Sequence, residues 1–451
     1  MTDALCTRAR AAVADAPPTG DPAYERYCRE LSRALSEHWP AVVDANAIDL
    51  AHARARGLPP TLLDRLRLTD THLDQLRHLT DTVGRELRAV TATEPAVPVA
   101  GWGRRRRVPR PLGVVLMVYE ARPTVTVEGA LLPVAVGNAV LMRGGKEIAH
   151  TNAALAAAAH QALRAAHLPT GLVTVLDDPD RATLRALLKR PDAIDVLIPR
   201  GSPSLIDHCR NTSTIPVIAS GGGVNHLYVH RSADLDLAAE AALDSKLPEP
   251  TACNTAELVL VDTDTAARFV TALLHAAERG RRPLTVRLDP RIPPPTTGPA
   301  HPGTAPPWRI AELKEHDLGR EFLDATIGVY PVAGLGEALT HIRRHGSGHT
   351  EGVWATDTAV TREFTRRVDA AAVIVNGSLR LHDGPTLGLG SELSISTGRL
   401  HARGPLTLAG LTTHSWIVEA HNTLRSSLPA PAPPLPAPLS AAPPAPAATH
   451  H

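Results

Sequence analysis

The 451-residue sequence has few aromatic side chains, few lysines and almost no net charge. Aromatic residues make up 3% of the chain, so its core has to be built mainly from Leu, Val, Ile and Ala. Basic residues number 47 and acidic residues 46, which leaves a formal net charge of +1 and no general attraction for nucleic acid. Only four of the basic residues are lysines, namely Lys146, Lys189, Lys246 and Lys314.

Cysteines and long apolar runs are also scarce. The four cysteines, Cys6, Cys28, Cys209 and Cys253, form no CxxC pair and no zinc-like cluster, so we expect no metal site. No run of about 18 apolar residues could span a bilayer, and the N-terminal segment lacks the apolar core of a secretory signal. These absences predict a cytoplasmic protein with reduced thiols and no membrane partner.

Two patterns divide the sequence. Over residues 1–90, apolar side chains such as Tyr24, Cys28, Leu31 and Leu35 recur at helical intervals, and Pro40 is expected to end their helix. From about residue 111, short apolar runs such as GVVLMVYE, NAVLMR and AIDVLIPR alternate with helical patterns. This alternation predicts a parallel sheet in a doubly wound α/β fold, in which ligands lie at the carboxyl ends of the strands.

Two later segments have a different composition. Residues 281–308 are rich in proline, and we expect them to form a surface excursion. From Leu428 the chain is almost wholly Pro and Ala, which cannot build a packed core, so we expect a disordered Pro/Ala-rich tail over residues 425–451.

Cys253 carries the strongest chemical signal. It stands in PEPTACNTAELVLV, before a run that we expect to be a helix beginning at Asn254 or Thr255. The positive end of a helix macrodipole would lower the pKa of the thiol and favour a nucleophilic thiolate. From the local sequence alone, a buried and unreactive cysteine is the alternative, and it stays open.

Two glycine turns follow apolar strands. RGGK (Arg143 to Lys146) and IPRGS (Ile198 to Ser202) each combine glycine, which lets a ligand approach the backbone, with a cation that suits a phosphate. Neither turn has the spacing of a Walker A loop or of GxGxxG. A nucleotide-phosphate site and ordinary strand-to-helix turns therefore both remain open.

The order of motifs along residues 42 to 417 resembles the gamma-glutamyl phosphate reductase (glutamate-5-semialdehyde dehydrogenase) family, a branch of the aldehyde dehydrogenase superfamily. The matching blocks include PLGVVLMVYEARPTVTVEGALLPVAVGNAVLMRGGKE, DVLIPRGSPSLI, CNTAELVLV, HIRRHGSGHTEG, VDAAAVIVNGSLRLHDG and LGLGSELSISTGRLHARGPLTLAGLTTHSW. In this resemblance Cys253 falls on the catalytic cysteine of the family.

The resemblance implies NADPH-dependent reduction of L-glutamyl 5-phosphate to L-glutamate 5-semialdehyde in proline biosynthesis, through a thioester on Cys253. No carboxylate is needed to activate water, and the PVIASGGG segment has no Glu where hydrolytic aldehyde dehydrogenases carry their base. Arg143 would meet the 2′-phosphate of NADP, and Glu321 would hold the nicotinamide ribose. The full set of implied cofactor residues is Arg143, Gly144, Gly145, Lys146, Pro199, Arg200, Gly201 and Glu321, and the implied substrate residues are Arg122, Asn376, Arg380 and Asp383.

The resemblance also implies an architecture. A Rossmann-like cofactor domain would span residues 1–225 and include an oligomerisation strand near 97–110. A second α/β domain with the nucleophilic cysteine would span 226–399, and 400–424 would complete a small oligomerisation element. We expect a homo-oligomer, either a dimer or a tetramer, and functional coupling to a glutamate 5-kinase.

Departures from the family pattern gather around the acyl site. Thr124 and Glu128 stand where usual members have Asn and Asp, and Glu249 stands where they have Arg. Arg380 could meet the glutamyl carboxylate, or it could form a salt bridge to Asp383. These changes keep two alternatives open: a paralogue that reduces another acyl phosphate or activated amino acid, and a catalytically inactive scaffold.

Overall fold

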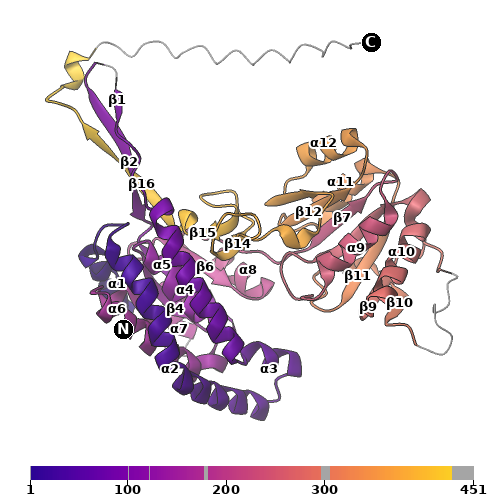
Figure 1. Cartoon of the computed structure of the whole chain (residues 1–451), viewed down its shortest axis with the longest axis horizontal. Helices are drawn as coiled ribbons and strands as arrows, with labels where there is room; N and C mark the ends of the chain where they lie inside the picture. The colour runs from indigo at the N-terminus through magenta and orange to yellow at the C-terminus, as the bar shows by residue number, and fades with distance from the viewer. Residues whose placement is uncertain (1, 100, 121, 177–180, 296–304, 429–451) are drawn as a thin grey trace. The chain divides into compact units, whose positions relative to one another are not determined.

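Two parallel sheets, a narrow three-stranded sheet and a two-stranded antiparallel sheet organise the described residues (Figure 1). The structure, a computed structural model, describes all residues except 1, 100, 121, 177–180, 296–304 and 429–451. Contact density divides it into a main unit, residues 1–92 and 110–413, and a smaller unit that comprises residues 93–109 and the chain from 414 onward.

The N-terminal sheet has four parallel strands in the order β5-β4-β3-β6. All six residues of β3 are buried, as expected for a central parallel strand covered on both faces. Met117 on β3 pairs with Met142 on β4 and Ile198 on β6, so these strands end at one edge of the sheet. The predicted doubly wound α/β fold is confirmed. The strands are β3 (Val114–Tyr119), β4 (Ala139–Arg143), β5 (Val173–Val175) and β6 (Val196–Arg200).

Helices supply most of the remaining core of this half. As the spacing predicted, Tyr24, Leu31 and Leu35 are buried on one face of the long helix α2. The helices are α1 (Thr2–Asp15), α2 (Pro22–Ala55), α3 (Pro60–Leu66), α4 (Asp70–Val90), α5 (Thr124–Ala135), α6 (Ala149–Ala165), α7 (Arg181–Leu187) and α8 (Pro203–Thr212).

The expected helix end at Pro40 is wrong. The helix begins where Asp21 accepts a hydrogen bond from the backbone N–H of Ala23 at 2.8 Å, and it continues through Pro40 to Ala55. An interior proline removes one backbone hydrogen bond and costs about 3 kcal/mol. Burial of Trp39 and Val42 beside it, and packing of α2 against α4 and α6, offset that cost.

The C-terminal sheet has seven parallel strands in the order β10-β9-β11-β8-β7-β12-β13. Its strands are β7 (Asn225–Val229), β8 (Ala256–Asp262), β9 (Leu284–Leu288), β10 (Trp308–Glu312), β11 (Thr326–Val332), β12 (Thr350–Trp354) and β13 (Ala372–Val375). Helices α9 (Leu235–Lys246), α10 (Ala266–Arg279), α11 (Leu335–His345) and α12 (Thr358–Arg367) alternate with them.

Two expectations in this region are corrected. The run after Cys253 forms β8, not a helix, because seven consecutive residues are buried between β7 and β11. The Pro-rich stretch 281–308 is not only a surface excursion, since it contains β9 and reaches the first residue of β10. Its middle part, 296–304, lies outside the described residues.

The chain returns to the core of the N-terminal sheet after the C-terminal sheet. Strands β14 (Glu392–Ser396) and β15 (Gly404–Thr407) pair antiparallel, and Leu393, Leu406 and Leu411 are buried in the same apolar cluster as β3 and β4. Residues 400–413 thus belong to the main unit, and the expected domain boundaries stay a prediction.

The smaller unit contains an antiparallel sheet in the order β1-β2-β16. Its strands are β1 (Val97–Val99), β2 (Gly103–Pro111) and β16 (Thr412–Glu419). Val97, Trp416 and Val418 are each about half exposed, at 49–50%. Of the expected disordered tail, a single 3-10 turn at Arg425–Ser427 is described, and 429–451 lie outside the described residues.

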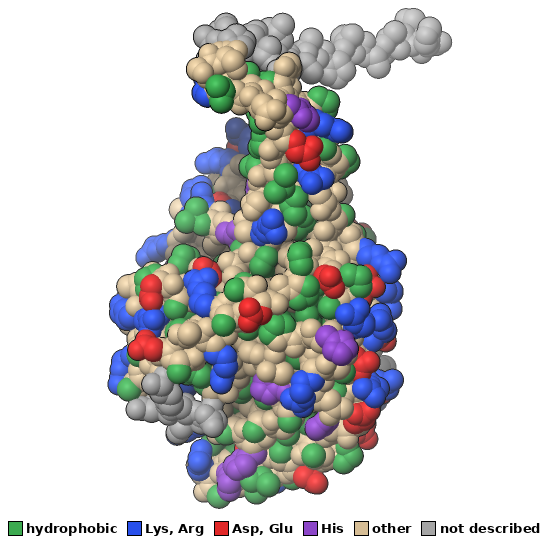
Figure 2. Space-filling model, turned by 90° about the vertical axis from the view of Figure 1, so that its left-hand side faces the viewer, with side chains coloured by type: hydrophobic (Ala, Val, Ile, Leu, Met, Phe, Trp, Pro, Cys, Tyr) green, Lys and Arg blue, Asp and Glu red, His purple; other side chains and the backbone are tan. Residues whose placement is uncertain are grey.

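The surface carries no extended region of one charge on the face that Figure 2 draws, where basic and acidic side chains lie intermixed. Among the described residues, no helix has both the length and the apolar character that crossing a membrane requires.

Candidate active site

Cys253 differs from the other three cysteines in its exposure. Cys6, Cys28 and Cys209 are buried in helices, whereas Cys253 is partly exposed. Burial raises the pKa of Cys28 to about 12 and that of Cys209 to about 11, so both thiols stay protonated at neutral pH. Cys253 is thus the cysteine that a substrate can reach.

The Cys253 backbone is held in a turn between α9 and β8. The buried Asn225 side chain donates hydrogen bonds to the carbonyl oxygens of Cys253, at 2.8 Å, and of Thr255, at 2.7 Å. On the other side lies Gly223, where a β-carbon would collide with the Cys253 carbonyl. A glycine is therefore required at 223 for the two segments to approach this closely.

Glu321 is anchored to the same glycine segment. Its Oε1 accepts a hydrogen bond from the backbone N–H of Gly223 at 2.7 Å, and its other oxygen lies against Gly222. The structure thus brings Glu321 and Cys253, which are 68 positions apart in the sequence, to the two sides of one glycine segment.

A fully buried ion pair connects the segments that carry Cys253 and Glu321. Lys246 Nζ lies 2.9 Å from both carboxylate oxygens of Glu257. Glu257 also accepts hydrogen bonds from the Thr255 hydroxyl and from the backbone N–H of Phe322, both at 3.0 Å. One carboxylate therefore connects the turn of Cys253 with the segment that carries Glu321.

The pKa of the Cys253 thiol is raised, chiefly because burial disfavours the charged form. The positive charge of Arg200 opposes this shift, as does that of Arg122, while the negative charges of Glu392 and Glu321 add to it. The expected activation by a helix macrodipole is wrong, because no helix begins at Asn254 or Thr255.

Charged side chains from the N-terminal half lie around this thiol. Arg200 Nη2 is 3.9 Å from Glu128 Oε2. Burial lowers the pKa of Arg122, and the neighbouring charges of Arg65 and Arg200 lower it further. Burial raises the pKa of Glu392 on β14 to about 7.

The segment after β13 contacts the cysteine turn through Arg380. Arg380 donates to the side-chain oxygen of Asn254 at 2.7 Å and to Glu249 at 2.6 Å. The salt bridge considered between Arg380 and Asp383 is thus replaced by one to Glu249, and Asp383 instead accepts hydrogen bonds from Thr386. The negative charge at 249, unusual for the family pattern, is therefore compensated by Arg380.

Asn376 has a local structural role. Its side-chain amide exchanges hydrogen bonds with the backbone N–H and C=O of Ala355, at 2.9 and 3.0 Å. This bonding occupies both ends of the amide, and a substrate role for Asn376 remains a prediction.

The two glycine turns follow β4 and β6, the strands on either side of β3. Arg143 ends β4, Gly144 and Gly145 follow, and the exposed Lys146 begins a short 3-10 helix. Gly144 is packed so closely that a β-carbon would meet the side chains of Asn152 and Tyr119.

The second turn already holds an anionic side chain. Pro199 and Arg200 end β6, and Gly201 follows them. Glu120 accepts hydrogen bonds from the backbone N–H of Ser202, at 2.7 Å, and from its hydroxyl, at 3.0 Å. Ser202 is the N-cap of α8, so its donors can bind an acceptor group. The donors, the cations and Glu321 suit a dinucleotide, so the residues present fit the implied cofactor.

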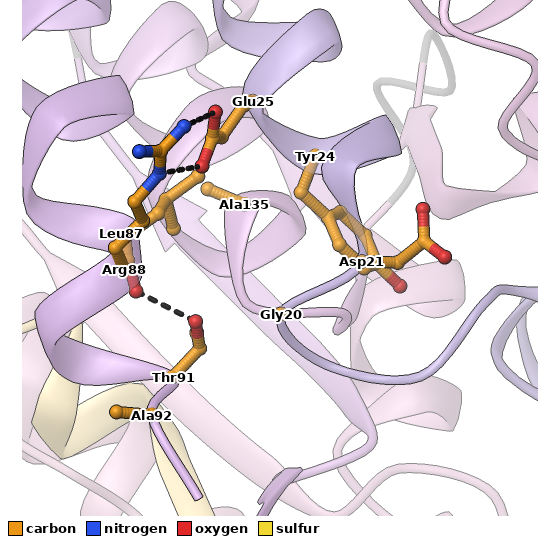
Figure 3. A pocket seen from close by; sticks show the side chains of 9 residues that line it. All are labelled: Gly20, Asp21, Tyr24, Glu25, Leu87, Arg88, Thr91, Ala92 and Ala135. Atoms are coloured by element: carbon orange, nitrogen blue, oxygen red, sulfur yellow. Dashed lines mark hydrogen bonds and ion pairs between the residues drawn. The ribbon is translucent and has the colours of Figure 1, made fainter.

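The main unit also contains a cavity that lies away from Cys253. It has a volume of about 180 Å³ and is lined by residues of α2, α4 and α5 (Figure 3). Glu25 and Arg88 form an ion pair at its wall, and the Thr91 hydroxyl donates to the Leu87 carbonyl. It contains none of the predicted site residues. The described residues hold no group of three or more His, Cys, Asp or Glu arranged to bind a metal ion.

Comparison with known proteins identifies the class. Residues 46–287 match the model of the aldehyde dehydrogenase family, and the chain belongs to that family. Within it, the chain is 40% identical over 411 residues to a gamma-glutamyl phosphate reductase of Escherichia coli, covering 89% of this chain and 94% of that protein. The resemblance seen in the motifs is thereby confirmed, and the chain groups with the gamma-glutamyl phosphate reductases.

Solved structures agree. The crystal structure of gamma-glutamyl phosphate reductase from Thermotoga maritima superposes with a TM-score of 0.85 at 30% identity, covering 94% of this chain and 99% of that one. An engineered glycolyl-CoA reductase with bound NADP+ has a TM-score of 0.68 at 16% identity, covering 94% and 98%, and shares the fold. Members of the aldehyde dehydrogenase family use a nicotinamide cofactor.

Sequence reasoning missed Asn225, the Lys246–Glu257 pair and Glu392. A signal existed for the pair, because Lys246 is one of only four lysines and Glu257 interrupts an apolar strand. Nothing in the local sequence marked Asn225, whose role depends on segments that meet only in the folded chain.

Proposed function

We propose that this protein catalyses the NADPH-dependent reduction of L-glutamyl 5-phosphate to L-glutamate 5-semialdehyde and phosphate, in proline biosynthesis. The observation that carries the proposal is the partly exposed thiol of Cys253, whose backbone carbonyl packs against Gly223 and whose pKa is lowered, against the effect of burial, by the charges of two arginines, in a member of this family.

The first step forms a thioester. Cys253 Sγ loses its proton and attacks the acyl carbon, the bond from that carbon to the phosphate oxygen breaks, and phosphate leaves. Because burial raises the pKa of the thiol, the positive charges of Arg200 and Arg122 are needed to favour the thiolate. The same charges attract the acyl phosphate.

The second step releases the aldehyde. When bound, the reduced nicotinamide supplies the hydride that converts the thioester to a thiohemiacetal. The thiohemiacetal then collapses, the C–S bond breaks, and Cys253 recovers its proton. Fixing of the cysteine turn by Asn225 and Gly223 keeps Sγ in place between the two steps.

Residues at the strand ends would hold the cofactor. Arg143 and Lys146 suit its adenosine phosphate end, and the N-terminus of α8 at Ser202 suits the pyrophosphate, which would replace Glu120 as the acceptor of the two Ser202 donors. Glu321 would accept hydrogen bonds from the nicotinamide ribose. The cation of Arg143 favours NADP over NAD, because only NADP carries a 2′-phosphate.

The protein acts as a homo-oligomer in this proposal. Trp416, Val418 and Val97 place half-exposed apolar side chains on the three-stranded sheet of the smaller unit, and a second copy would cover them. Since acyl phosphates are labile, the reaction also calls for functional coupling to the kinase that makes the substrate.

The test is NADPH oxidation with glutamyl phosphate generated from ATP and L-glutamate by a separate kinase. The expected result is NADPH oxidation that requires both ATP and L-glutamate and is lost in Cys253→Ser. Oxidation with another acyl phosphate, such as β-aspartyl phosphate, but none with glutamyl phosphate would assign the protein to a paralogous reaction. Absence of turnover with any acyl phosphate would favour a scaffold.

A further inference from the structure

A charged cavity lies beside the candidate active site. Its volume is about 370 Å³, and it is formed where α3 and the start of α4 face the first turns of α5. Three arginines, Arg65, Arg67 and Arg122, line it together with two carboxylates, Asp64 and Glu128. The cavity is therefore both basic and equipped to receive a cation.

Two of the three arginines form no ion pair with the described residues, although the charge of Glu128 raises the pKa of Arg122. Arg67 lies 3.6 Å from Asp64, which balances its charge. Within the part of the chain that the structure describes, Arg65 and Arg122 make no hydrogen bond or ion pair. They repel one another, and the charge of Arg65 lowers the pKa of Arg122. A bound anion would relieve that repulsion.

Charged residues of the cavity wall influence the pKa of the Cys253 thiol. Arg122 is close enough to Cys253 for its charge to lower the pKa of the thiol, as does Arg200. Arg200 in turn lies 3.9 Å from Glu128, the carboxylate on the cavity wall. Two residues of the cavity wall, Arg122 and Glu128, are therefore linked electrostatically to the surroundings of the thiol, so we infer that a ligand held by them extends toward Cys253.

We propose that this cavity binds the amino-acid end of the substrate and sets its specificity. Arg122 and Arg65 would hold the α-carboxylate, and Glu128 would accept hydrogen bonds from the α-ammonium group. The planar guanidinium binds a carboxylate through two parallel hydrogen bonds, which an ammonium side chain cannot reproduce. This inference rests on the proposed function and adds the residues that distinguish an α-amino acid from a simple acyl chain.

A site built for two charges rejects analogues that lack one of them. A missing substrate charge leaves a desolvated protein charge unpaired, which reduces kcat/KM far more than the loss of a methylene group. Removing one partner of such a pair costs about 10²-fold or more. We therefore expect the wild-type protein to discriminate strongly against both the decarboxylated and the deaminated analogue.

The reverse reaction provides the test, since phosphate-dependent oxidation of an aldehyde with NADP+ is read as NADPH formation. Three aldehydes are compared: glutamate 5-semialdehyde, 4-aminobutanal, which lacks the α-carboxylate, and 5-oxopentanoate, which lacks the α-amino group. In Arg122→Met, the ratio of kcat/KM for the semialdehyde to kcat/KM for 4-aminobutanal should fall by about 10²-fold, because the loss of thiolate lowers both values equally and only the semialdehyde also loses its carboxylate partner. Arg65→Met should show the same pattern, and Arg122→Lys should recover only part of the activity.

Glu128→Gln tests the other end of the ligand. Its kcat/KM for glutamate 5-semialdehyde should fall, and that for 5-oxopentanoate should not. Arg67→Met is the matched control, because Arg67 lines the same cavity but is already paired with Asp64, so its preference among the aldehydes should stay that of the wild type. Urea-unfolding midpoints equal to that of the wild type would show that the variants keep their fold.

The outcomes separate the two proposals. If the wild-type protein oxidises glutamate 5-semialdehyde but Arg122→Met and Arg65→Met keep its preference for that aldehyde, the specificity site is wrong and the proposed function stands. If the wild-type protein oxidises none of the three aldehydes, the proposed function falls, and the specificity site falls with it.

Discussion

The two parallel sheets bury different kinds of side chain. In the N-terminal sheet, β3 and β4 are filled with Val, Leu and Met, and among the described residues of its surrounding helices the one buried acidic side chain is that of Asp49. The C-terminal half buries Lys246 and several carboxylates, among them Glu257 and Glu351. Apolar packing therefore stabilises the first sheet, whereas charge pairs hold the strand ends of the second.

The buried charges of the C-terminal sheet lie where loops must be fixed. Glu351 accepts hydrogen bonds from the backbone N–H of His226, at 2.9 Å, next to Asn225, which binds the Cys253 carbonyl. Glu257 accepts hydrogen bonds from Thr255, two residues after Cys253, and from Phe322, the residue after Glu321. A buried ion pair adds little net stability compared with apolar packing, but it fixes geometry. The difference between the sheets thus follows the location of the chemistry.

The largest effect should come from the thiol itself. Cys253→Ala is expected to lower kcat by about 10³-fold or more, because no other nucleophile can form the acyl intermediate, while its unfolding midpoint stays near that of the wild type. Cys209→Ala, in the N-terminal half, should show the reverse: normal kcat and a loss of about 1 kcal/mol in stability. Steady-state kinetics and urea unfolding measure both.

Breaking the buried pair should destabilise the C-terminal sheet strongly. Lys246→Met leaves Glu257, whose pKa burial already raises to about 7, without its buried counterion, so we expect a loss of about 3–5 kcal/mol in the free energy of unfolding. In the double variant Lys246→Met/Glu257→Gln the loss should be smaller, because the uncompensated charge is gone. A double variant as unstable as the single one would contradict a role for charge here.

A cavity in the N-terminal sheet should act on stability alone. Leu116→Ala on β3 is expected to cost about 2–5 kcal/mol, since Leu116 is fully buried and its site cannot collapse completely. Alkylation of Cys253 in the remaining folded protein should proceed at the wild-type rate. A changed rate would show that the two halves are coupled more tightly than their separate cores suggest.

The smallest effect concerns pH. Because the pKa of Cys253 is raised above its ordinary value, alkylation of the ligand-free protein should be slow at pH 7 and still increase beyond pH 9. Arg122→Met removes a positive charge, so it should move the profile to still higher pH. A thiol already fully reactive at pH 7 would contradict this electrostatic environment.

Local sequence patterns correctly predicted strands that are buried along their whole length and helices with one continuous apolar face. The buried runs of β3, β4 and β6 and the apolar face of α2 are of this kind, and motif order located Cys253, Arg380 and Glu321. The helix end at Pro40 and the helix after Cys253 were wrong because neighbouring elements override local preference. The Lys246–Glu257 pair could not be predicted, since two charges become partners only when the fold removes water from both.

The contact between Gly223 and the Cys253 carbonyl also sets a limit for protein engineering. A saturation library at position 223 should return glycine alone among active clones. Even the β-carbon of alanine would collide with the Cys253 carbonyl and displace the turn that carries the nucleophile. Attempts to retune this enzyme for other acyl donors should therefore leave that loop untouched and vary the cavity wall around Arg122 instead.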